Sequence, residues 1–82
     1  MNGLSDQEIK LIKKNYPKGT RLVCKEMFDP QPVPAGTKGT VDSVDDSGQI
    51  HVNWDNGSTL ALIPFYDEFK TLEEIEAAEG KK

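Results

Sequence analysis

The chain has 82 residues, of which 35% are hydrophobic, and this is enough for one domain with a modest core. It contains one cysteine, Cys24, and no apolar run of bilayer length, and its N-terminus lacks the basic and apolar regions of a signal peptide. These features argue against a disulfide-stapled secreted domain and against membrane association. We therefore expect a single cytoplasmic domain over residues 1–82.

The charge is distributed unevenly along the chain. The net charge is −4, but residues 9–25 contain six basic residues and no acid, so the remainder carries −10. Two interpretations of this basic segment stay open. It either packs against acidic parts of the same chain or is simply solvated, or it presents a basic face to a partner.

The first predicted element is a helix over residues 4–15. Ser5 and Glu8 have the spacing of a capping box, in which each side chain bonds the backbone of the other residue. Lys13 and Lys14 fall in the last turn, where the helix dipole favours cations. Pro17 biases the preceding residues away from helix and ends the element.

Residues 16–72 contain four further segments that read as short strands, and a fifth around Phe69. The alternation of apolar and polar residues predicts which side chains face the core. These are Leu22, Cys24, Ile50, Val52, Trp54, Leu60 and Leu62. Met27 is out of phase and indicates a bulge or the end of the first strand, and a proline-rich, semi-extended loop follows it.

The chain is predicted to end in a second short helix over residues 72–79. Thr71 and Glu74 form another capping box at its start, and residues 80–82 are expected to be a frayed tail. Five short strands with turns every few residues indicate a mainly β fold. We expect a small five-stranded SH3-like barrel with a short helix at each end, because a closed barrel leaves no edge strand exposed.

Four sequence motifs in order resemble a known family. "YPKGTRL", "GTKGTV", "VNWDNGSTL" and "IP" are similar to domain of unknown function 4314 over residues 16–72. The family consists of small bacterial proteins often carried on phages or conjugative elements, and the resemblance implies an SH3-like barrel with no established activity. Over three strands, "GTKGTV…VNWDNGST" also resembles SH3-like domains of the Mib/Herc2 type, and this second resemblance implies peptide binding.

The candidate peptide-binding residues combine aromatic rings with prolines. In SH3-like barrels the long loop and the last turn often lie together and form a recognition groove. The residues expected there are Phe28, Pro32, Phe65 and Tyr66, and Tyr66 is expected to be the exposed member. The alternative is that the rings of Phe28 and Phe65 only cover the open end of the barrel. The leading prediction is a non-enzymatic module that binds an unknown protein or peptide.

The alternative function is nucleic-acid binding by the basic segment 10–25. "GTKGTV" loosely resembles the turn and strand of ribosomal KOW motifs, whereas the overall acidity and the lack of interleaved aromatic residues oppose this reading. The residues that would meet phosphates are Lys10, Lys13, Lys14, Lys18 and Arg21.

No catalytic, cofactor or metal motif stands out in the sequence. His51 is predicted on the outer face of its strand without a second ligand, and Cys24 is predicted inside without a base. Asp42, Asp45 and Asp46 lack the spacing of a calcium loop and read as turn residues, although a weak cation site is an alternative. We therefore expect no enzyme, no cofactor and no metal.

The tetrad Trp54-Asp55-Asn56-Gly57 allows two readings. In one, Trp54 closes the core while Asp55 and Asn56 bond the backbone of the turn. In the other, Trp54 lines a groove and Asp55 orients a ligand. The phase of Trp54 with Ile50 favours the first reading.

Overall fold

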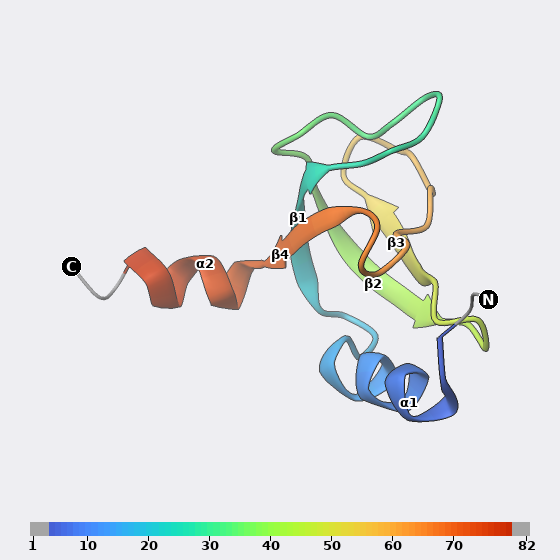
Figure 1. Ribbon diagram of the computed structural model, residues 1–82. Helices are drawn as coiled ribbons and strands as arrows, with labels where there is room; N and C mark the ends of the chain where they lie inside the picture. The colour runs from blue at the N-terminus through green and yellow to red at the C-terminus, as the bar shows by residue number, and fades with distance from the viewer. Residues whose placement is uncertain (1–3, 80–82) are drawn as a thin grey trace.

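The computed structural model describes residues 4–79 and shows a mainly β protein with two short helices (Figure 1). The tail expected at residues 80–82 lies outside the described residues. The elements in chain order are α1 (Asp6–Asn15), β1 (Arg21–Glu26), β2 (Lys38–Val44), β3 (Ile50–Trp54), β4 (Glu68–Thr71) and α2 (Leu72–Glu79). The strands form one antiparallel sheet in the order β3-β2-β1-β4. Within residues 4–79 no helix has the length and apolar character needed to cross a membrane.

Helix α1 begins at the predicted capping box. The Ser5 hydroxyl accepts from the Glu8 amide, and the Glu8 carboxylate accepts from the Ser5 amide. The helix covers the turn between β2 and β3 at one end of the sheet (Figure 1). Gly48 in that turn has a φ of 87°, a left-handed conformation that favours glycine, and a methyl group there would also push against the end of the Leu4 side chain.

The core forms on the face of the sheet that the alternation predicted. Leu22 and Cys24 of β1 and Ile50, Val52 and Trp54 of β3 are all buried, which confirms their inward phase. The register shifts after Cys24, where the out-of-phase Met27 indicated an irregularity. Strand β4 and the capping box before α2 also form as expected.

The fourth predicted strand, residues 58–63, does not form as a strand, whereas the fifth, around Phe69, forms as β4. Its only ladder contact within the described residues is an isolated bridge between Ile50 and Leu62. The backbone of this segment is satisfied locally instead: Leu60 accepts a hydrogen bond from Trp54 Nε1 at 2.9 Å and donates one to Ser58 Oγ at 3.3 Å. The sheet is therefore open and four-stranded rather than the closed five-stranded barrel that we expected.

Candidate functional site

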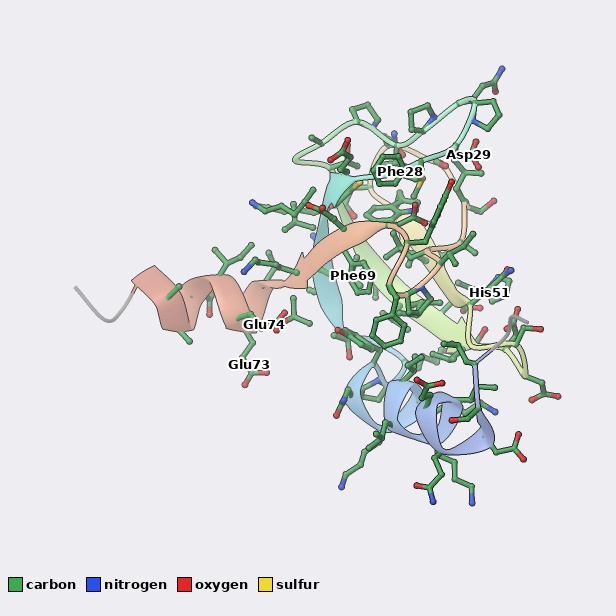
Figure 2. The ribbon with its side chains drawn as sticks, in the orientation of Figure 1. Phe28, Asp29, His51, Phe69, Glu73 and Glu74 are labelled. Atoms are coloured by element: carbon green, nitrogen blue, oxygen red, sulfur yellow. The ribbon has the colours of Figure 1, made fainter. Side chains whose placement is uncertain are left out.

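The long loop after β1 and the turn before β4 meet at an aromatic pair. The rings of Phe28 and Tyr66 pack edge to face with centroids 5.4 Å apart. Both side chains stay about half exposed, so the pair borders solvent instead of closing the core. Figure 2 shows Phe28 and Asp29 at the end of the molecule opposite α1. Two of the four predicted peptide-binding residues are thus in contact.

Asp67 connects the two segments that carry the aromatic pair. It is buried, and its carboxylate accepts hydrogen bonds from the Phe28 amide at 3.0 Å and the Ile63 amide at 2.8 Å. One carboxylate therefore joins the long loop to the last turn across 39 residues of sequence. Sequence reasoning missed Asp67, because nothing local in the sequence marks a residue that bonds a distant loop.

Phe65 does not join the aromatic pair but lines a second surface. It is 82% exposed and has a φ of 68°, a left-handed conformation that is rare for a bulky residue. It lines an apolar groove of about 360 Å³ between α1 and the segment before β4. The groove is lined by Glu8, Leu11, Ile12, Asn15, Tyr16, Pro64, Phe65 and Phe69. Pro32, the fourth predicted peptide-binding residue, is exposed on the long loop and does not line this groove.

Leu11 is an exposed apolar residue of this groove that could not be assigned to a site from the sequence. It lies in α1 among lysines, off the face that Ile12 and Tyr16 present to the core, and it is 56% exposed. An apolar residue on the polar side of an amphipathic helix was the available signal. Leu11 and Phe65 therefore expose two large apolar side chains along one groove.

A more polar hollow continues the groove toward α2. It shares Asn15 and Tyr16 with the groove and is lined further by Lys14, Thr71, Glu73 and Glu74, among others. Tyr16 packs edge to face against Phe69, with centroids 5.5 Å apart. Burial raises the pKa of Tyr16, and the charge of Glu74 raises it further. We call the groove and this hollow together the furrow.

Two residues of the basic segment pair with acids elsewhere in the chain. Lys13 pairs with Asp46 at 3.2 Å, and Arg21 forms a bidentate pair with Asp55 at 2.9 and 2.8 Å. The hydrogen bond with Asp55 raises the pKa of Arg21. These contacts match the interpretation in which the basic segment meets acids of the same chain. The remaining candidate phosphate ligands, Lys10, Lys14 and Lys18, are exposed.

The other candidate residues, Cys24, His51 and Asp45, are buried or hydrogen-bonded within the chain. Cys24 is completely buried, and its pKa is raised by burial and then by the charge of Asp67. His51 Nε2 lies 2.9 Å from Asp45, whose carboxylate also accepts from the amides of the β2–β3 turn. In the part of the chain that the structure describes, no three His, Cys, Asp or Glu side chains gather as metal ligands would.

The Trp54 tetrad follows the first reading with one correction. Trp54 is buried, and Asn56 accepts from the Ser58 amide at 3.0 Å as a turn residue does. Asp55 was expected to bond the turn backbone too, but its carboxylate binds Arg21 of β1. The guanidinium offers two parallel donors, which a carboxylate accepts more strongly than single amides.

Comparison with known proteins gives one match. No curated protein and no solved structure is significantly similar to the chain. A family model described as "Domain of unknown function (DUF4314)" matches residues 5–72. These residues include α1, the whole sheet, the Phe28–Tyr66 pair and the lining of the groove. The chain therefore belongs to this family.

Proposed function

We propose that the protein is a non-enzymatic module that binds a segment of another protein through the furrow. The observation that carries this proposal is the placement of Leu11 and Phe65, which are 56% and 82% exposed along one groove. Exposed apolar side chains gathered at a groove are typical of surfaces that a partner covers.

The backbone of Phe65 supports this proposal. A bulky residue with positive φ costs on the order of 1–3 kcal/mol, and such strain persists mainly where function requires it. Here the strain directs a nearly fully exposed ring to the groove and contributes nothing to the core. Tyr66, which packs against Phe28, directly follows Phe65 in the sequence, so the same turn can present a second contact to the partner.

The proposal also includes a more specific description of the fold. We regard the open sheet as an SH3-like barrel whose strand over residues 58–63 is reduced to the Ile50–Leu62 bridge. The two backbone hydrogen bonds of this bridge, 2.9 and 2.8 Å long, and the place of β4 beside β1 support this view. As the family resemblance implies, we infer that the protein is a bacterial product of a phage or mobile element. A cytoplasmic location, which the single cysteine favours, belongs to the same proposal.

The experiment is a selection of short peptides from a random library on the wild-type protein, followed by affinity measurements on variants. Phe65→Asn removes the ring and suits the left-handed backbone, so it should be more stable by about 1 kcal/mol and yet lose peptide affinity. Ile63→Ala is the matched control, because Ile63 is an exposed apolar residue outside the groove lining. Equal affinity of the wild type and Phe65→Asn would refute binding in the furrow.

Nucleic-acid binding is the second candidate. The exposed side chains of Lys10, Lys14 and Lys18 support it, whereas the acids beside Lys13 and Arg21 oppose it. We expect weak oligonucleotide binding that decreases as salt increases and that is lost when Lys10 and Lys14 become glutamates. An affinity that does not depend on salt would contradict this candidate.

A further inference from the structure

The free edge of β4 borders the furrow, and its hydrogen-bonding groups can be assigned. In the β1–β4 register Cys24 faces Phe69. The N–H of Cys24 donates to the Thr37 carbonyl at 2.8 Å, and its carbonyl accepts from the Gly36 amide at 2.7 Å. Both groups of Cys24 thus point away from β4. Facing residues of an antiparallel pair either exchange both bonds or both point outward, so the N–H and C=O of Phe69 point to the outer edge.

The backbone groups on either side of Phe69 are already used. The Thr71 amide donates to the Glu74 carboxylate at 2.8 Å, and the Asp67 amide donates to the Ile63 carbonyl at 2.9 Å. Within residues 4–79, β4 is an edge of the sheet and nothing bonds the outward groups of Phe69. The edge therefore offers one donor and one acceptor on the same residue, as a strand partner requires.

The same residue lines the groove. Phe69 contributes to the lining with Leu11, Tyr16 and Phe65, so a chain bonded to its backbone would have apolar surface beside it. This combination is the one used when an extended peptide adds to a sheet: the main chain supplies hydrogen bonds, and alternate side chains enter apolar pockets. A helix could fill the groove but would leave both groups of Phe69 unbonded.

The charges of the furrow specify the partner further. Its lining includes three carboxylates, Glu8, Glu73 and Glu74, and one basic side chain, Lys14. The exposed Glu73 and Glu74 lie on the first turn of α2, directly after β4 (Figure 2). A basic segment therefore complements the furrow better than an acidic one.

We propose that an extended, basic and apolar segment of a partner protein adds as a strand to the edge of β4 at Phe69. Its apolar side chains enter the groove beside Leu11 and Phe65, and its Lys or Arg side chains meet Glu73 and Glu74. This inference rests on the proposed function, because it names how the segment binds and what kind of segment it is. A second copy of the chain is a poorer occupant, because its β4 carries Glu68 as well as Lys70 and so brings no net positive charge to the acidic furrow.

The test uses three synthetic peptides on the isotope-labelled full chain, followed by amide NMR. The first is Lys-Val-Lys-Phe-Lys-Val-Lys, the second has Glu in place of every Lys, and the third is the first with N-methyl groups on the backbone of its central three residues. We expect the first peptide to shift the Phe69 amide downfield and to slow its exchange with solvent. The acidic and the N-methylated peptides should each bind at least about tenfold more weakly.

Variants separate this inference from the proposed function. Glu73→Gln should weaken the basic peptide several-fold, whereas Glu76→Gln, an exposed carboxylate of the same helix outside the furrow lining, should not. Shifts at Leu11 and Phe65 with equal affinity for the N-methylated peptide would overturn strand addition but leave binding in the furrow intact. Silence at Phe69 with all three peptides at millimolar concentration would overturn strand addition. A Phe69 shift that depends on protein concentration alone would assign the edge to a second copy and overturn it too.

Discussion

Asp67 is the residue whose loss should most clearly uncouple the long loop from the last turn. In Asp67→Ala the amides of Phe28 and Ile63 lose the acceptor to which they donate at 3.0 and 2.8 Å. A hydrogen bond to a charged group contributes about 1.5–3 kcal/mol. Both amides are only partly buried and can recover some bonding to water, so we take the lower figure for each bond and expect a loss of about 3 kcal/mol.

Urea unfolding followed by tryptophan fluorescence measures this loss, because Trp54 is the single tryptophan and is 3% exposed. With a slope of roughly 1–1.5 kcal/mol per molar urea, the midpoint should fall by about 2–3 M. Asp67→Asn keeps one acceptor and should lose about half as much. Amide exchange at Phe28 and Ile63 should accelerate in both variants. An alanine variant that unfolds within about 0.5 M urea of the wild type would refute the reasoning.

Three further outcomes are expected. Gly39→Ala should lower the melting temperature, with a loss of about 1–3 kcal/mol, because the new methyl group would lie 2.5 Å from Val52 Cγ1 in the packed core; an unchanged or higher melting temperature would contradict this. Burial raises the pKa of Asp45, but hydrogen bonds from His51 and two turn amides outweigh it, so the pKa lies below its ordinary value of 3.8. The stabilisation by Asp45 is thus present above that value and is lost as the pH falls through the lowered pKa. Urea unfolding should therefore show that Asp45→Asn lowers the free energy of unfolding more at pH 7 than at pH 2. Ser5→Ala should cost about 1 kcal/mol by removing the cap of α1, with faster amide exchange in the first helical turn as the readout.

The parts of the fold that short-range chemistry determines were predictable from the sequence. The capping boxes at Ser5 and Thr71 involve residues three apart, and both form as expected. The inward phase of β3 follows from strict alternation, which only one face of a sheet can satisfy. In β1 the alternation placed Leu22 and Cys24 inside correctly, but Val23, expected on the outer face, is buried as well. The meeting of Phe28 with Tyr66 could be anticipated only through the resemblance to a fold, because no local rule brings them together.

The remaining features depend on contacts that the sequence does not encode locally. Residues 58–63 have a strand-like composition, yet bonds to Trp54 and within the segment replace most of the ladder. The left-handed backbone of Phe65 contradicts its residue type, so no propensity could predict it. Asp55 was assigned to its own turn because its partner, Arg21, is 34 residues away in the sequence. In each case a tertiary partner outweighs a local preference.

The single thiol of the protein reports on the motion of the loop that covers it. Cys24 has no exposed surface, and its Sγ donates to the Val33 carbonyl at 3.5 Å in the loop that carries Phe28. A thiol reagent can therefore reach Cys24 only in molecules whose loop has opened, so the labelling rate measures how often the loop lifts from the sheet. A partner that binds the Phe28–Tyr66 pair would hold the loop down and slow the labelling of Cys24 without contacting the cysteine. A partner confined to the furrow would leave the labelling rate unchanged.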